Sequence, residues 1–448
     1  MGKKLNYGRT FLIGLAFMSI SSFWQIYDNI IPLMLTRTFG LGDTVTGVIM
    51  AMDNVLAIVL LPVFGAISDK VNTRIGKRMP FIITGTVLAV TFMSFLPIAD
   101  TAANLPLFVG ALFGALISMG LYRSPSVALM PDLTPNRLRS KANAIINLLG
   151  AVGGVYSLIM IKLLVPAVEK PNYRNLFLSV SVLMVVAIVV LFFTINEKKV
   201  AARVAKEEEA YQAQLKETGT ADEEVKTEAK AEADDGAEPV KKTVLTPEVK
   251  HSMIFMLASI FLWFTAYNAV TTAFSRYVVE VWKLEGGGFA DCLLVATIAA
   301  IISYIPIGHI SSRIGRKKTI MGGVLLMASC YLFAIFMTEY HPVINVAFAL
   351  IGVAWAAINV NSYPMIVAMS KGADIGKFTG TYYTFSMAAQ IVTPILSGAL
   401  LENVSYMTLF PYALFFSLLA FVTMTQVRHG DVKPQAKKDL LENFDVED

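Results

Sequence analysis

The chain has 448 residues, and its composition excludes a water-soluble globular protein. Apolar residues make up 55% of it and charged residues only 16%, against roughly 25% charged residues in soluble domains. So few charges leave too little polar surface to face water on all sides, and much of the surface must therefore face lipid. The formal net charge of +4 comes from basic residues in short loops between apolar runs, which indicates membrane topology and not nucleic-acid binding.

Twelve apolar stretches are long enough to cross a bilayer, which takes about 20 helical residues. In the first half we expect spans at 10–36, 45–67, 80–99, 105–130, 141–165 and 174–195. In the second half we expect them at 252–277, 290–311, 319–338, 342–369, 377–401 and 407–427. The sequence predicts an all-α membrane protein with twelve transmembrane helices in two pseudo-symmetric six-helix bundles, at residues 1–196 and 251–428.

The segment between the bundles differs in character from both of them. Residues 197–250 are rich in Glu, Lys, Ala and Asp, and such a segment is too polar to bury a core of its own. We predict a charged, flexible cytoplasmic linker, in which 200–217 has the composition of a solvated helix. A binding site for a regulator is the alternative. Residues 429–448 are expected to form a cytoplasmic tail.

Basic residues in the short loops predict the orientation of the chain in the membrane. One set of loops holds many of them, including Lys3, Lys4, Arg9, Lys70, Arg137, Lys141, Lys371, Lys377 and Arg428. The opposite loops hold fewer: Arg37, Lys170, Arg174 and Lys283. Both termini are therefore expected to be cytoplasmic. The lack of long extensions favours a bacterial plasma membrane, and we expect a monomer.

The two halves share a loop pattern at equivalent places. Arg74-Ile75-Gly76-Lys77-Arg78 follows the second span, and Arg313-Ile314-Gly315-Arg316-Lys317 follows the eighth. Such a match between two six-span units indicates a parallel repeat, which in transporters places the substrate path at the interface of the repeats.

The loop after the second span carries the most specific motif in the chain. It runs from Gly65 through Ser68-Asp69-Lys70 to Arg78-Met79-Pro80-Phe81. The glycine at 76 relieves backbone strain, Asp69 can pair with a base or a helix N-terminus, and the cations can engage helix C-termini and anionic lipid. Charge links of this kind can latch one half of a carrier against the other. We predict a cytoplasmic gate formed by Asp69, Arg74, Gly76, Lys77, Arg78, Asp132, Arg139, Arg313 and Arg316.

This loop resembles the signature of the major facilitator superfamily, and its longer form is similar to sucrose/proton symporters and to the glycoside–pentoside–hexuronide symporters. A second stretch, from Pro125 through Asp132-Leu133 to Arg139 and Ala142-Asn143-Ala144, resembles the region between the fourth and fifth spans of sucrose carriers. The resemblance implies the two-bundle major facilitator fold, a central cavity, alternating access and cation-coupled sugar uptake.

Two features depart from the pattern of these families. Plant sucrose symporters have an acidic residue in the fourth span where this chain has Leu116. The paired aspartates of melibiose-type carriers align with Ala57 and Leu61, so that sodium site is missing. The coupling group must therefore lie elsewhere, or coupling is absent.

Three ionisable residues within the spans of the first half are candidates for function, because charges inside a membrane are costly. Asp28 and Asp53 lie at similar depth in the first two spans, and two neighbouring carboxylates in a low dielectric should not both stay ionised. We predict proton coupling by Asp28 and Asp53, with a structural role as the alternative. Arg123 is predicted to hold a carboxylate or sugar hydroxyls, and the alternatives are a structural ion pair or snorkelling.

A sugar site needs aromatic platforms with amides beside them, because sugars present C–H faces and a rim of hydroxyls. Several helix faces combine these groups at helical spacing. Each of them also has a simpler explanation, as interfacial aromatics or as polar contacts between helices. We predict substrate binding by Trp24, Arg123, Asn143, Asn147, Tyr267, Asn268, Trp355, Asn359, Tyr383 and Gln390.

The sequence thus predicts a transporter that imports a di- or oligosaccharide of the sucrose or maltose type by proton symport. The alternative is a carrier for another solute, including proton-coupled efflux of a metabolite or drug. An enzyme is not expected, because the four histidines are scattered and the chain shows neither a metal-ligand cluster nor a pairing of nucleophile and base. No cofactor is expected, and protons are expected to be the coupling ion.

Overall fold

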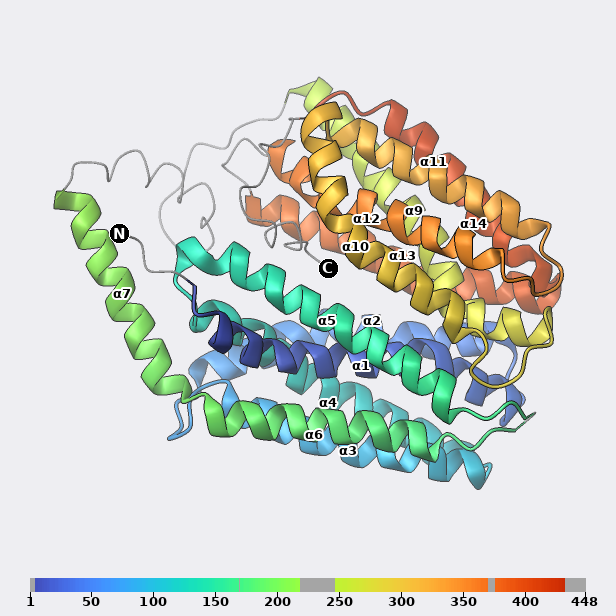
Figure 1. Cartoon of the computed structure of the whole chain (residues 1–448), viewed down its shortest axis with the longest axis horizontal. Coiled ribbons are helices and arrows are strands. Elements are labelled where there is room, and N and C mark those ends of the chain that lie inside the picture. Colours follow the sequence, from blue (N-terminus) through green and yellow to red (C-terminus); the bar gives the residue numbers. More distant parts are fainter. Residues whose placement is uncertain (1–4, 169, 218–245, 370–374, 432–448) are drawn as a thin grey trace.

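The computed structural model describes residues 5–168, 170–217, 246–369 and 375–431, and it shows two helical bundles lying side by side (Figure 1). The described residues contain 12 helices that are long and apolar enough to cross a membrane, which confirms the predicted fold class. The first bundle contains α1 (Tyr7–Arg37), α2 (Asp43–Lys70), α3 (Met79–Thr101), α4 (Leu105–Asp132), α5 (Arg139–Leu164) and α6 (Arg174–Thr194).

The second bundle repeats this plan. It contains α9 (Pro247–Glu280), α10 (Ala290–Ile314), α11 (Arg316–Ile335), α12 (Ile344–Met369), α13 (Ile375–Asn403) and α14 (Leu409–Thr425). One-turn 3₁₀ helices, η1 (Asn136–Leu138) and η2 (Tyr406–Thr408), precede α5 and α14. These two short helices do not occupy equivalent places in the repeat, since η1 lies before the fifth span and η2 before the twelfth.

Consecutive spans alternate in direction, which gives the molecule two ends. We call the end where α1 and α9 begin the terminal end, and the opposite one, which holds the loops after α1, α5 and α9, the distal end. Side-chain caps start several helices: Asn6 accepts a hydrogen bond from the backbone N–H of Arg9 (3.0 Å), and Asn104 accepts one from that of Leu107 (3.0 Å). Each cap satisfies one of the N–H groups that the first turn of a helix leaves unpaired.

The two bundles approach most closely where α2 packs along α13. A Cβ atom at Gly47 would lie 2.1 Å from the carbonyl oxygen of Pro394, and one at Gly398 would lie 2.4 Å from that of Asp43. Glycine is therefore required on both helices, because only the missing side chains let the two backbones touch. Both contacts involve the part of α2 that begins at the distal end.

The segment predicted as a linker begins with a helix. Residues Glu197–Glu217 form α7, which leaves the first bundle at the end of α6 and runs across the terminal end (Figure 1). Its Val204 is buried, and the guanidinium of Arg137 lies over the ring of Tyr211 at 4.4 Å. The stretch 218–245 of the predicted linker, and 432–448 of the predicted tail, lie outside the described residues.

Candidate functional site

A cavity of about 850 Å³ lies between the two bundles. Its lining comes from α1, α4 and α5 of the first bundle and from α9, α10, α12 and α13 of the second. At the terminal end it reaches Arg139 and Ser140, the first residues of α5. A cavity of this size between repeats is where transporters of this plan hold their substrate.

The two walls of the cavity differ in chemistry. The first bundle contributes polar and charged side chains from α1, α4 and α5: Ser21, Gln25, Asp28, Arg123, Arg139, Ser140, Asn143 and Asn147. The second bundle contributes most of the aromatic rings, to which the first adds Phe17 and Trp24. Tyr267 and Trp355 are stacked with their ring centres 3.8 Å apart and their planes within 5°, and Tyr304 and Tyr383 also line this wall.

Most of the residues predicted to bind substrate line this cavity. They are Trp24, Arg123, Asn143, Asn147, Tyr267, Trp355 and Tyr383. Asn268, Asn359 and Gln390 are not among its lining residues, and Asn359 is only 7% exposed. Sequence reasoning missed Gln25 and Tyr304, which line the cavity without the paired aromatic and amide pattern that we searched for.

The two carboxylates predicted to couple protons lie in different spaces. Asp28 lines the main cavity, whereas Asp53 lines a separate chamber of about 20 Å³. Asp53 accepts hydrogen bonds from the backbone and side-chain N–H groups of Asn54, at 2.6 and 2.7 Å. The charges of Asp28 and Asp53 act on each other, and the charge of Arg123 acts on Asp53. The two aspartates and the arginine therefore form one electrostatic cluster.

The small chamber also contains the positions at which this chain departs from the families that it resembles. Ala57, Leu61 and Leu116 all line it. Asp53 precedes Ala57 by four residues and Leu61 by eight, which places the three on one face of α2. The chain thus keeps a carboxylate in the same chamber, one helical turn away from the aligned positions.

Contacts between the bundles close the distal end. Arg276 of α9 forms an ion pair with Asp43 of α2, and both are buried, with 2% and 7% of their side chains exposed. The hydroxyl of Tyr406 donates to the other oxygen of Asp43 at 2.5 Å. We call these three residues the distal latch. Its position between α2, α9 and η2 means that the bundles cannot separate here without breaking it.

Two further ion pairs join the bundles at the distal end. Arg37 donates two hydrogen bonds to Glu285, at 2.6 and 2.9 Å, and Lys162 lies 2.6 Å from Asp291. The hydrogen bonds from Arg37 hold the pKa of Glu285 below its usual range. The stabilisation that this ion pair gives is therefore complete above the ordinary pKa of a glutamate. It is lost as the pH falls through the lowered pKa of Glu285.

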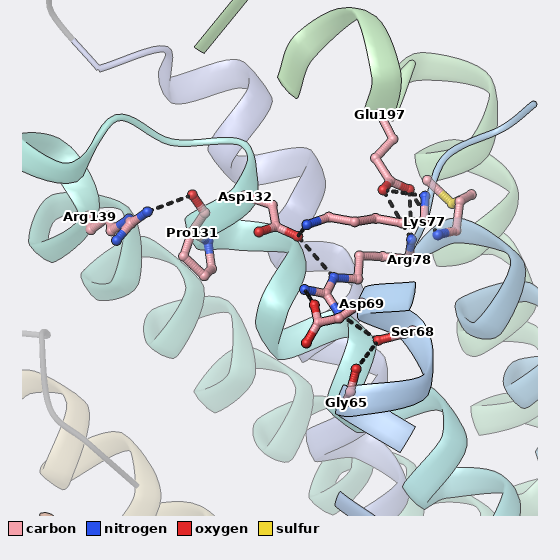
Figure 2. A network of polar contacts seen from close by, with 10 residues as sticks. Gly65, Ser68, Asp69, Lys77, Arg78, Pro131, Asp132, Arg139 and Glu197 are labelled. Carbon is pink, nitrogen blue, oxygen red and sulfur yellow. Dashed lines mark hydrogen bonds and ion pairs between the residues drawn. The ribbon is translucent and has the colours of Figure 1, made fainter. Parts of the chain in front are cut away.

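At the terminal end, the predicted gate residues form a dense network around Arg78 (Figure 2). Arg78 pairs with Asp69, donates to Asp132 at 2.9 Å and donates to the hydroxyl of Ser68 at 2.5 Å. Lys77 lies 3.2 Å from Asp132. These contacts join α2, α3 and α4 of one bundle, whereas the sequence suggested links between the halves. They hold the first bundle together in this conformation.

The other predicted gate residues are placed differently. Arg139 donates to the carbonyl oxygen of Pro131 at 3.3 Å, also within the first bundle (Figure 2). Arg316 donates to the carbonyl oxygen of Pro364 at 3.4 Å, within the second. Arg74 and Arg313, which are equivalent in the repeat, are both exposed. The contacts of each basic loop thus lie within its own bundle.

Both repeated loops are closed by an acidic residue that follows the last helix of the same bundle. Glu197 accepts backbone N–H groups of Lys77, Arg78 and Met79, at 2.7, 3.0 and 2.9 Å (Figure 2). Asp431 accepts that of Lys317 at 3.0 Å. The glycines of the two loops, Gly76 and Gly315, have φ of 127° and 96°, so a side chain would be strained at either position. The acidic charge also suits the positive end of the helix dipole.

Replacing Glu197 by alanine should destabilise the first bundle. The change leaves buried N–H groups at the start of α3 without an acceptor, at a cost of about 1–2 kcal/mol. We expect a lower Tm for the purified protein in detergent. Glu209→Ala is the matched control, because Glu209 lies on the same helix and is exposed. An equal Tm for both variants would contradict the capping role.

Two six-helix membrane bundles that enclose a polar and aromatic cavity, closed at one end by contacts between the bundles, define a secondary transporter. The sequence profile of the Major Facilitator Superfamily matches residues 12–302 and 286–442. The chain belongs to this superfamily, and it is a transporter and not an enzyme.

More specific similarities cover shorter stretches. The rice (Oryza sativa subsp. japonica) sucrose transport protein SUT3 is 28% identical over 138 residues, which are 27% of this chain and 27% of that protein. The chloramphenicol resistance protein CraA of Acinetobacter baumannii is 27% identical over 116 residues, 26% of this chain and 28% of that protein. The matches thus span about a quarter of the length of each relative.

Solved structures show the same fold over nearly the whole chain. The peptide transporter POT in complex with sulfate has a TM-score of 0.67 at 14% identity, and covers 95% of this chain and 97% of its own. The xylose transporter XylE from E. coli, in a partially occluded inward open conformation, has a TM-score of 0.61 at 14% identity, with 93% and 98% covered.

Proposed function

We propose that the protein imports a di- or oligosaccharide together with protons, by alternating access in a plasma membrane. The observation that carries this proposal is the combination, in one cavity, of hydrogen-bonding side chains from the first bundle with aromatic rings from both bundles. A sugar presents hydroxyls along its rim and C–H groups on its faces, so it fits such a lining. Two amides, Asn143 and Asn147, line the same cavity as the rings of Tyr267 and Trp355.

The terminal end is taken as cytoplasmic, because its loops hold most of the Lys and Arg residues. The distal latch then closes the outer side, and the cavity opens toward the cytoplasm. This is the inward-facing state of an alternating-access cycle. The resemblance to SUT3 of rice agrees with a sugar as substrate.

Asp53 is the proposed proton carrier, since it lies next to Arg123 and away from the wall that meets the substrate. Its carboxylate balances the charge of Arg123 when it is ionised. When Asp53 takes up a proton, the charge of Arg123 is no longer balanced. That positive charge then acts on the main cavity, which Arg123 also lines. Proton binding and substrate binding would thus be linked through one side chain. Asp28, inside the main cavity, is proposed to accept sugar hydroxyls.

Uptake into proteoliposomes tests the proposal. Labelled sucrose, maltose and related disaccharides are offered to the reconstituted protein, with and without an inward proton gradient. We expect accumulation above the outside concentration only with the gradient, and its loss when a protonophore collapses the gradient. Absence of transport for every disaccharide would overturn the substrate class, and accumulation that ignores the gradient would overturn the coupling.

Replacing Trp355 by alanine should weaken sugar binding and leave the fold intact. The ring stacks on Tyr267 and lines the cavity. Losing an aromatic contact of this kind costs about 0.5–1.5 kcal/mol, or roughly a two- to tenfold rise in KM. Trp355→Phe keeps a ring and should stay close to wild type. Equal KM values for both variants would argue against stacking.

A carrier that exports a metabolite or drug is the second candidate, supported by the match to CraA of Acinetobacter baumannii. The charged wall with Asp28, Arg123 and Arg139 argues against it, because hydrophobic drugs favour a broadly apolar lining. Protection of growing cells against chloramphenicol, together with no disaccharide transport by the purified protein, would favour this function.

A further inference from the structure

The chamber around Asp53 is separated from the main cavity by two side chains. Trp24 and Arg123 are the residues that line both spaces. The chamber has a volume of about 20 Å³, which is enough for one water molecule. Asp53 and Arg123 are the charged groups in its wall, and the rest of the wall is Trp24 and apolar residues of α2 and α4. A sugar is far too large to enter it.

Trp24 is held between the two spaces by its neighbours on α1. Its ring meets those of Phe23 and Tyr27 edge to face, with ring centres 5.0 and 5.4 Å apart. Tyr27 in turn donates to the carbonyl oxygen of Met50, on α2, at 3.0 Å. The indole N–H of Trp24 is buried and has no hydrogen-bond partner among the described residues. A buried donor of this kind calls for an acceptor, and a water in the chamber is one that fits.

We infer that the chamber binds a single water molecule that relays protons between the main cavity and Asp53, and that Trp24 is the gate of this path. The inference rests on the proposed proton coupling. A hydronium ion in the main cavity passes a proton to the chamber water and becomes water, and the chamber water passes one of its own protons to the carboxylate of Asp53. Asp53 becomes neutral, and the chamber water is unchanged.

The charged and titratable groups near Asp53 are consistent with this path. Asp28 and Tyr27 face it from α1, and Arg123 faces it from α4. The helix α13, which also packs along α2, carries its charged side chains near its two ends, at Lys377 and Glu402. Protons therefore reach Asp53 past Trp24 and Arg123, and a substrate resting on Trp24 controls when they do so.

Thiol labelling measures whether Trp24 separates the two spaces. Leu116, in the chamber wall, is replaced by cysteine in a chain that carries Cys292→Ser and Cys330→Ser, and methyl methanethiosulfonate is added. We expect Trp24→Ala to speed labelling about tenfold or more, because it removes the barrier to the buried thiol. Trp24→Phe, which keeps a ring in place, should label nearly as slowly as the parent. Ala300→Cys in the main cavity should react at one rate in all three backgrounds.

Proton flux supplies the second readout. Proteoliposomes with Trp24→Ala should leak protons without sugar, and those with Trp24→Phe should stay tight. Equal labelling of Leu116→Cys in all backgrounds would overturn the gate. Faster labelling without a leak would overturn the proton role of the chamber. If the leak appears but Asp53→Asn still accumulates sugar normally, the path stands and the proposed coupling through Asp53 falls.

Discussion

Replacing Asp53 by asparagine is expected to abolish sugar accumulation driven by a proton gradient. Asparagine has nearly the same shape but takes up no proton, so the carrier loses its link to the gradient while its cavity stays intact. Exchange of labelled for unlabelled sugar at equal concentrations needs no net proton movement, and it should continue at a reduced rate. Gradient-driven uptake and exchange, measured on the same proteoliposomes, separate the two effects.

Asp28→Asn is the informative comparison, because Asp28 lines the main cavity and Asp53 does not. Its loss should raise the KM for exchange as well as reduce accumulation. Glu339→Gln is the neutral control, since Glu339 is exposed in a loop at the distal end. Normal accumulation in both aspartate variants would show that neither carboxylate couples protons.

The helices could be predicted from the sequence because lipid leaves few choices. Each span must satisfy its own backbone hydrogen bonds, so it appears as a long apolar run. The helix predicted at 174–195 is α6 (Arg174–Thr194), and that at 105–130 is α4 (Leu105–Asp132). The glycine predicted to relieve backbone strain in the first loop, Gly76, adopts a positive φ, as does its equivalent Gly315.

The site could be predicted only in part, because helical spacing places residues on a face without saying what that face meets. Trp355 lines the cavity, yet Asn359 does not, although it lies one turn further along α12. Four residues turn a helix by about 400°, so each such step drifts from the previous direction. In α12, which packs against α10 and α11, this drift is enough to bury Asn359 among its neighbours.

No pattern in the sequence predicted the distal latch or the capping of α3 by Glu197. Glu197 begins a run of charges that is typical of a solvated segment, and its buried partners are backbone groups with no residue identity. Asp43 and Arg276 are 233 positions apart. Their pairing depends on how the two bundles pack against each other. The sequence pattern of each bundle predicts its own helices but not this packing.

Replacing Arg276 by methionine should shift the carrier away from the conformation described here. The change leaves Asp43 buried with the hydroxyl of Tyr406 as its remaining side-chain partner. Breaking a buried ion pair in this way costs about 3 kcal/mol or more. The pair joins the bundles only while the distal end is closed, so the cost falls on that conformation and changes the ratio of the two states by on the order of a hundredfold. Labelling of Ala300→Cys from the side of the terminal end should slow, and labelling from the side of the distal end should speed up.

The double variant Asp43→Asn with Arg276→Gln is expected to recover much of the original ratio, because neutral amides can bond to each other without a buried charge. Lys283→Ala is the matched surface control. Lys283 lies 3.9 Å from Glu280 with 76% of its side chain exposed, and exposed pairs of this kind contribute little. If Arg276→Met and Lys283→Ala label alike from both sides, the distal latch does not set the balance between the two states. If only the Arg276→Met variant shows changed labelling, the distal latch contributes to holding the distal end closed, alongside the ion pairs Arg37–Glu285 and Lys162–Asp291. Opening of this end then requires the buried pair to break.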